Sequence, residues 1–290
     1  MEIKHYDKNG SCLNYGCAGQ TGGRLLHFAH ANGFSSGVYE PLIDNLARDR
    51  RVVGMNICGQ SECNISDCSK DRRLTSWHML AREQYEFLRN MSGGRRIVAV
   101  GHSIGGAVTL LNAAAHPEMF EKIILLDPVL LEPSLIRLIR FMALMRQQRR
   151  APLAVRARKR RNNWKSRDEA LEHFRDKPLF AGWDEASLRA YVKYGLKDSP
   201  NGGVELACSP EAEAQGFETY PTDIWKQVRR LRTPTLMVRG GDSDTLTVRA
   251  RDLFLRFLPG ADYIELSGVG HLFPMQQPAN VAAIIRKYGV

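Results

Sequence analysis

The stretch that most constrains the fold is IVAVGHSIGGAVTLLNAAAHP at residues 97–117. Its first four residues are apolar, as is typical of a buried central strand. GHSIG at 101–105 then matches G-x-S-x-G, a pattern in which a serine occupies a strained turn between a strand and a helix. Glycine is expected on both sides of Ser103 because a Cβ there would collide with a neighbouring strand or helix, and Gly106 lets the helix begin close to the sheet. The apolar residues that follow predict a buried helix.

Strands and helices alternate along most of the chain. A hairpin is expected over residues 1–23, with its turn at Asn9-Gly10. Further strands are expected at 24–29, 51–55, 97–100, 123–127, 234–239 and 261–266. Helices are expected at 41–48, from Thr75 to the turn at 92–94, from Gly106 to Ala115, and at 249–258 and 279–287. This order predicts an α/β protein with a mostly parallel, doubly wound sheet.

The alternation is interrupted between residues 128 and 232, where the sequence is helical in pattern, aromatic and basic. We interpret this segment as a helical cap inserted over the carboxyl edge of the sheet, where open α/β sheets place their sites. The predicted domains are therefore a core of residues 1–127 and 233–290 and a cap of residues 128–232.

Three positions in the predicted core could together activate a nucleophile. Ser103 lies at the turn described above, and His271 follows the last predicted strand in GVGHLF. A serine hydroxyl is a poor nucleophile at neutral pH, so a histidine must take its proton and later return it to the leaving group. A carboxylate after the next-to-last predicted strand would orient that imidazole. The predicted chain order, serine, acid, histidine, is one of the known orders of such triads.

Several motifs together resemble the α/β-hydrolase superfamily over essentially the whole chain. They are HANGF at 30–34, GHSIGG at 101–106, IILLDPV at 123–129, PTLMVRGGDSDTL at 234–246 and GVGHLFPMQQP at 268–278. The resemblance is strongest to esterases and lactonases that carry a helical cap, and it implies the α/β-hydrolase fold.

The resemblance also implies roles for particular residues. Asp244 matches the position of the catalytic acid. Asp242, two residues earlier, is the local alternative. Asp127 is a more remote one, since some relatives take the acid from the end of the preceding strand. The backbone N–H groups of Asn32 and Ile104 would form the oxyanion hole, with Gly33 the next candidate after Asn32. The side chain of His30 is expected to brace this loop and to take no part in the chemistry.

The predicted activity is hydrolysis of carboxylic esters through an acyl-enzyme on Ser103, without a cofactor or metal. A serine at the turn, where some relatives of this fold carry aspartate, favours an acyl intermediate over an alkyl ester. The methionines and aromatic residues of the predicted cap would suit an apolar or aryl acyl group. The same triad would serve lactones, thioesters, amides or carbon–carbon bonds. A ligand-binding sensor on a hydrolase scaffold is the alternative from another functional class.

The chain is basic, with a net charge of +10 and a pI near 9.5. Residues 131–145 have apolar residues at helical spacing accompanied by arginines. We favour a cap helix whose apolar side covers the acyl pocket over a helix lying on a membrane surface. The run RARKRR at Arg156 to Arg161 is interpreted as a solvated turn of a cap helix. No nucleic-acid-binding motif accompanies it, so nucleic acid is not expected as a partner.

The sequence also bears on compartment and metals. No apolar run reaches the ~20 residues of a membrane span, and the N-terminus lacks the apolar core of a signal peptide. A cytoplasmic protein with reduced thiols is therefore expected. Cys58, Cys63 and Cys68 are evenly spaced, but they lack the close C-x-x-C pairs typical of zinc and cluster sites, so a metal is not expected there.

Overall fold

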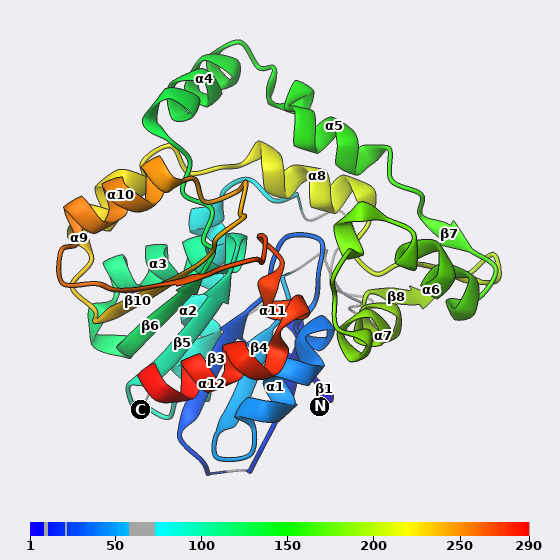
Figure 1. Ribbon diagram of the computed structural model, residues 1–290, viewed down its shortest axis with the longest axis horizontal. Helices are drawn as coiled ribbons and strands as arrows, with labels where there is room; N and C mark the ends of the chain where they lie inside the picture. Colours follow the sequence, from blue (N-terminus) through cyan, green and yellow to red (C-terminus); the bar gives the residue numbers. More distant parts are fainter. Residues whose placement is uncertain (9–10, 21, 58–72, 290) are drawn as a thin grey trace.

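The structure is a computed structural model that describes residues 1–8, 11–20, 22–57 and 73–289 (Figure 1). An eight-stranded sheet with the order β1-β2-β4-β3-β5-β6-β10-β11 forms its centre. The strands β1, β2 and β4 pair antiparallel, and the neighbours from β4 to β11 pair parallel. A separate apolar core lies on each face of the sheet. The structure thus confirms the predicted α/β class and the mostly parallel, doubly wound sheet.

The elements of this core agree closely with the sequence prediction. The strands are β1 (Glu2–Lys8), β2 (Ser11–Ala18), β3 (Leu25–Ala29), β4 (Arg51–Met55), β5 (Ile97–His102), β6 (Phe120–Leu126), β10 (Thr235–Gly240) and β11 (Asp262–Leu266). The helices are α1 (Glu40–Leu46), α2 (Trp77–Met91), α3 (Ile104–Ala115), α10 (Val248–Phe257), α11 (Phe273–Gln276) and α12 (Pro278–Tyr288). The expected leading hairpin is β1 and β2, in which Lys8 pairs with Ser11.

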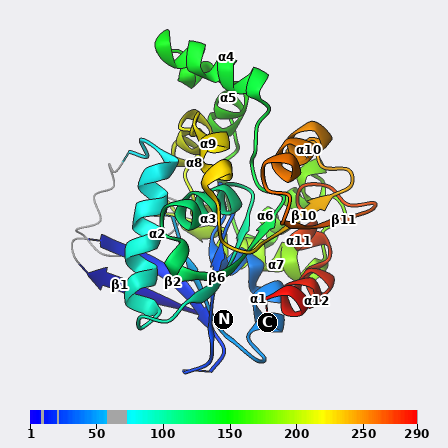
Figure 2. The same ribbon diagram turned by 90° about the vertical axis from the view of Figure 1, so that its left-hand side faces the viewer.

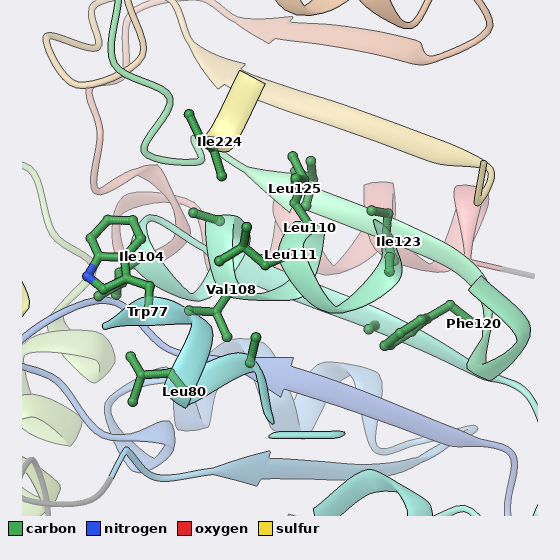
Figure 3. Packing of buried hydrophobic residues seen from close by; sticks show 14 of the residues in the cluster. Trp77, Leu80, Ile104, Val108, Leu110, Leu111, Phe120, Ile123, Leu125 and Ile224 are labelled. Atoms are coloured by element: carbon green, nitrogen blue, oxygen red, sulfur yellow. The ribbon is translucent and has the colours of Figure 1, made fainter. Parts of the chain in front are cut away.

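The helix α3 is the most deeply buried helix of the core, as its apolar sequence predicts. Every residue from Ile104 to Ala113 is buried, and all six residues of β5 before it are buried as well. Figure 3 shows how its side chains pack between α2 and β6, together with Trp77, Leu80, Ile123, Leu125 and Ile224. This packing fixes where α3 begins, and therefore where Ser103 lies.

The segment between β6 and β10 adds no strand to the main sheet. It contains α4 (Pro133–Leu144), α5 (Pro152–Arg158), α6 (Arg167–Arg175), α7 (Glu185–Tyr194), α8 (Pro210–Glu218) and α9 (Ile224–Arg230). It also contains a small antiparallel sheet, β7-β9-β8, formed by β7 (Asn163–Trp164), β8 (Leu196–Asp198) and β9 (Val204–Leu206). Figures 1 and 2 show α4, α5 and α8 above the sheet, on the side away from both termini.

The last helix of this segment belongs physically to the core. The side chains of Ile224, Trp225 and Val228 in α9 are buried in the same apolar cluster as α3. Figure 3 shows Ile224 beside α3. The division of the chain at residues 127 and 232 stays a prediction.

In the described residues, no helix is both long enough and apolar enough to cross a membrane.

A histidine lies inside the sheet without a hydrogen-bonding partner. His27 in β3 is fully buried, and neither of its ring nitrogens has a partner in the described part of the chain. Its ring lies beside Phe87, with 6.3 Å between the ring centroids. Burial lowers the pKa of His27 from its ordinary 6.5 to about 3, because the charged imidazolium cannot be solvated there.

We expect His27 to make the fold sensitive to acid. The folded state binds this proton more weakly than the unfolded chain, so the stability is fully present above pH 6.5 and is lost as the pH falls toward 3, by about 1.4 kcal/mol per pH unit. Urea denaturation at pH 7.5 and pH 5 should therefore show a smaller loss of stability in His27→Leu than in wild type. His5→Leu, on an exposed position of β1, is the control. Equal losses in His27→Leu and wild type would contradict this account.

Candidate active site

Ser103 occupies a strained turn between β5 and α3. Its φ of 58° lies in a region that side chains other than glycine rarely adopt. The glycines around it are required sterically, as predicted. A Cβ on Gly101 would lie 2.4 Å from the carbonyl oxygen of Gly105, and a Cβ on Gly105 would lie 2.3 Å from that of Ala29. A Cβ on Gly106 would be 2.9 Å from the carbonyl oxygen of Gly101. The turn is therefore held against the ends of both β5 and β3.

The structure brings Ser103 and His271 into direct hydrogen-bonding contact. The hydroxyl oxygen of Ser103 lies 3.0 Å from Nε2 of His271. Nδ1 of the same ring lies 2.7 Å from Oδ2 of Asp127. A proton on Nδ1 satisfies the carboxylate, and this tautomer leaves the lone pair of Nε2 directed at the serine hydroxyl. The three side chains form the geometry in which a serine can lose its proton to a histidine.

The carboxylate of Asp127 is buried and fixed by hydrogen bonds. Its side chain has no exposed surface and its φ is 42°. Oδ1 accepts a hydrogen bond from the backbone N–H of Gly240 at 3.1 Å, and Oδ2 accepts one from the hydroxyl of Ser243 at 2.5 Å. With the bond from His271, the carboxylate accepts three hydrogen bonds, which is the condition under which a charge can be buried.

The prediction that Asp244 orients His271 is wrong in the structure. Asp244 is exposed, and its carboxylate accepts a hydrogen bond from the hydroxyl of Thr245 at 3.3 Å. Asp242 is exposed as well. The reason is the order of the strands. Because β6 lies directly beside β5, with His102 paired to Leu126, the residue after β6 is next to the residue after β5. Asp127 therefore lies beside Ser103.

Sequence reasoning also missed Ser243. It is buried between the two exposed aspartates, and besides donating to Asp127 its oxygen accepts the N–H groups of Thr245 and Leu246 at 3.2 and 3.3 Å. The loop after β10 thus contributes a hydroxyl where an acid was expected. For Asp127 the sequence did contain a signal, because this residue directly follows the apolar run IILL. Nothing in the sequence showed that Asp244 would point into solvent.

A buried chain of hydrogen bonds connects the loop after β3 to the loop that carries His271. The N–H of Ala31 donates to the hydroxyl of Tyr39 at 3.1 Å, and that hydroxyl lies 2.7 Å from Nδ1 of His102. Nε2 of His102 lies 2.9 Å from the carbonyl oxygen of His271. Burial, together with the nearby His271, holds the pKa of His102 well below its ordinary value, so the ring is neutral.

The tautomer of His102 follows from these contacts. A carbonyl oxygen can only accept, so Nε2 of His102 donates to His271 and Nδ1 accepts the proton of Tyr39. Every donor and acceptor in this series of hydrogen bonds then has a partner, and none of the groups carries a charge. His102 therefore acts on the site through the backbone of His271, and it fixes the loop on which the imidazole is carried.

The predicted oxyanion donors lie on the two loops that meet at Ser103. Ile104 is the first residue of α3, a position whose N–H has no acceptor within the helix. Asn32 follows β3, and its side-chain amide donates to the carbonyl oxygen of Glu213 in α8 at 2.8 Å.

His30 braces this loop, as predicted. Its Nδ1 lies 2.7 Å from the carbonyl oxygen of Ala31, and its Nε2 accepts the N–H of Ile57 at 3.0 Å. Burial lowers the pKa of His30 to about 4.

The basic run at residues 156–161 is partly paired, and it is not simply a solvated turn as expected. Arg158 binds the carboxylates of Glu211 and Glu218, and Arg160 binds Glu213 and the hydroxyl of Tyr191. The bonds to glutamate join α5 and the turn after it to α8, and the bond to Tyr191 joins that turn to α7. A Cβ on Gly33 would lie 2.9 Å from the carboxyl carbon of Glu213, so the same pairs also support the loop next to Asn32.

No group of three or more His, Cys, Asp or Glu side chains that could hold a metal occurs in the described ranges. Cys58, Cys63 and Cys68 lie outside the described residues, so the expectation of a metal-free chain stays a prediction. Within those ranges, Cys17 and Cys208 are free thiols.

Comparisons with known proteins agree with this geometry. The model of the alpha/beta hydrolase family matches residues 28–284. Lipase LipV of Mycobacterium tuberculosis is 30% identical over 204 residues, which are 69% of this chain and 70% of the lipase. The abhydrolase domain-containing protein ACTT2-1 of Alternaria alternata is 25% identical over 226 residues, 65% of this chain and 81% of that protein. The crystal structure of E-2-(acetamidomethylene)succinate hydrolase has a TM-score of 0.80 at 19% identity, covering 99% of this chain and 98% of the other, so it shows the same fold. Together they support a hydrolase.

The two candidate acids can be separated by conservative substitution. Asp127→Asn keeps the shape of the side chain but removes the charge that orients and stabilises the imidazole, so we expect hydrolysis of a p-nitrophenyl ester to slow by about 10³–10⁴-fold. Asp244→Asn is the matched control and should change the rate less than about twofold. Circular dichroism establishes that both variants are folded. A large loss in Asp244→Asn with little change in Asp127→Asn would contradict the assignment.

Proposed function

We propose that this chain, which belongs to the alpha/beta hydrolase family, is a serine hydrolase that cleaves carboxylic esters through an acyl-enzyme on Ser103. The observation that carries the proposal is the continuous alignment of Ser103, His271 and Asp127, with contacts of 3.0 and 2.7 Å. A serine at a strained turn, in contact with a histidine that a buried carboxylate orients, is an arrangement suited to acyl transfer.

Acylation would proceed from these positions. As the hydroxyl oxygen of Ser103 attacks the ester carbonyl carbon, Nε2 of His271 takes its proton, and the charge of Asp127 stabilises the resulting imidazolium. The carbonyl oxygen becomes an oxyanion, and the N–H groups of Ile104 and Asn32 would donate to it. When the carbon–oxygen bond of the ester breaks, His271 gives the same proton to the leaving alcohol.

Deacylation would repeat these roles with water as the nucleophile. His271 takes a proton from the water as its oxygen attacks the acyl carbon, and it returns that proton to Ser103 as the acid leaves. The sum is one ester and one water converted to one acid and one alcohol. The series of hydrogen bonds through His102 keeps the His271 loop in place during both acylation and deacylation.

We propose an apolar or aryl acyl group because aromatic side chains lie on and beside the loop that carries the predicted oxyanion hole. Phe34 follows Asn32 and Gly33, and its ring lies 6.0 Å from that of Trp183 and 5.6 Å from that of Tyr191, measured between centroids. Phe180 continues this aromatic cluster into the segment between β6 and β10. Such surroundings favour an apolar group over a charged one.

The proposal is tested with p-nitrophenyl esters of increasing acyl length. We expect the wild type to hydrolyse them and Ser103→Ala to lose at least about 10³-fold in kcat/KM, because the nucleophile is removed while the fold remains. Thr109→Ala, a buried substitution elsewhere on α3, is the control for damage to the helix. Equal activity in wild type and Ser103→Ala would reject Ser103 as the nucleophile. A wild type inert on every ester would reject ester hydrolysis and favour thioesters, lactones, amides, carbon–carbon bonds or a sensor.

A further inference from the structure

We infer that α4 and the start of α5 form a surface that binds an anionic lipid bilayer. We call residues 133–156 the arm. The arm begins a few residues after Asp127. At this point few residues connect it to the core. The carboxylate of Glu132 accepts a hydrogen bond from the hydroxyl of Thr247 at 2.9 Å, and Ile136 is the buried residue of α4. Figures 1 and 2 both show α4 at the extreme of the molecule, farthest from the two termini.

Part of the apolar surface of α4 packs on the core through Ile136 and Ile139, but a larger part is exposed to solvent. The sequence had led us to expect that this apolar surface covers the acyl pocket. Most of the large apolar side chains that are exposed in the described part of the chain lie on the arm: Leu135, Leu138, Phe141, Leu144, Met145 and Leu153. Phe141 is 60% exposed and Leu144 is 80% exposed. An exposed cluster of this kind marks an interaction surface, because water solvates it poorly.

The charged residues within the arm's own sequence are of one sign, although the carboxylate of Glu211 in α8 lies 3.5 Å from the guanidinium of Arg149. From Pro133 to Arg167 the sequence contains twelve lysines and arginines and no aspartate or glutamate. Some of these residues are paired with carboxylates, as described above for Arg158 and Arg160. In the part of the chain that the structure describes, no carboxylate lies within ion-pair distance of the exposed Arg137, Arg146, Arg150 or Arg156.

A hollow of about 460 Å³ adjoins the inner side of α4 and has the same character. Its apolar lining includes Ile136, Trp225 and Phe257. Its cations are Arg137, Arg140, Lys226 and Arg229, and its one carboxylate, Asp223, is already bound to His78 and Gln227. Arg229 lies over the ring of Phe257 at 4.1 Å, and Arg140 donates to the carbonyl oxygen of Thr222. A lipid with an anionic headgroup and an apolar chain fits such a lining.

This combination identifies the partner chemically. A helix with exposed leucine and phenylalanine beside arginines that no described carboxylate pairs with is suited to lie in a bilayer interface. Its apolar side chains would lie among the acyl chains and its arginines at anionic headgroups. The long arginine side chains can extend from the helix to the headgroup level. The arm adjoins the edge of the sheet that carries Ser103, so binding would place the site near esters that partition into the bilayer. The inference itself does not depend on the proposed reaction.

Vesicle co-sedimentation tests the inference without any turnover. We expect the full chain to pellet with vesicles of 70% phosphatidylcholine and 30% phosphatidylglycerol at 50 mM salt, and to be released at 500 mM salt because screening weakens the attraction. It should remain in solution with pure phosphatidylcholine. Failure to pellet with the anionic vesicles at 50 mM salt would overturn the inference.

Two pairs of variants separate the arm from the general positive charge of the chain. Arg146→Glu/Arg150→Glu should weaken binding by about tenfold or more, whereas Arg48→Glu/Arg95→Glu makes the same change in net charge at exposed positions of the core and should bind nearly as wild type. Phe141→Ser/Leu144→Ser should also weaken binding, and Leu179→Ser/Val248→Ser is its control at exposed positions outside the arm. Equal losses in a variant and its control would reject a specific surface.

Sedimentation velocity addresses a different occupant, a second copy of the chain. We expect a monomer without vesicles, and an unchanged sedimentation coefficient in Phe141→Ser/Leu144→Ser. A wild-type dimer that this variant dissociates would show that the apolar face is covered by another copy, and the inference of a bilayer would be rejected.

Discussion

The close approach of α3 to the ends of β5 and β3 is the constraint on which the site depends. Glycines at 101, 105 and 106 permit this approach, since a Cβ at any of them would lie within 3 Å of backbone oxygen. The buried packing of α3 then compensates for the strained backbone at Ser103. Because β6 is the next strand in the sheet, the same arrangement determines that Asp127 is the carboxylate within reach of His271.

Much of this architecture could be predicted from the sequence. Apolar runs bounded by glycine and polar turns identified the strands, and G-x-S-x-G placed Ser103 correctly because its chemistry and its local geometry lie in one short stretch. The acid was harder, because its identity depends on which strands are neighbours and on which side chains point inward. Asp127 ends one predicted strand, and Asp244 follows another. The sequence does not reveal that Ser243 turns inward between two aspartates that face solvent.

The structure also connects the chemistry to the segment between β6 and β10. Asn32 is bound to α8, the ion pair of Arg160 and Glu213 supports the adjoining Gly33, and Tyr39 and His102 connect this loop to His271. The apolar spacing of residues 131–145 predicted the helix α4 correctly but could not say what its apolar side faces. A pattern of that kind is the same for a helix packed on a pocket and for one exposed at the extreme of the molecule.

The central claim is that Ser103 is a nucleophile activated by His271. The most direct measurement is reaction with a fluorophosphonate, which phosphonylates an activated serine, followed by mass spectrometry of the proteolysed chain. The account predicts one adduct on the peptide that contains Ser103, and strongly reduced labelling in His271→Ala, in which the serine is present but no base takes its proton. Labelling of another residue, or equal labelling with and without His271, would contradict it.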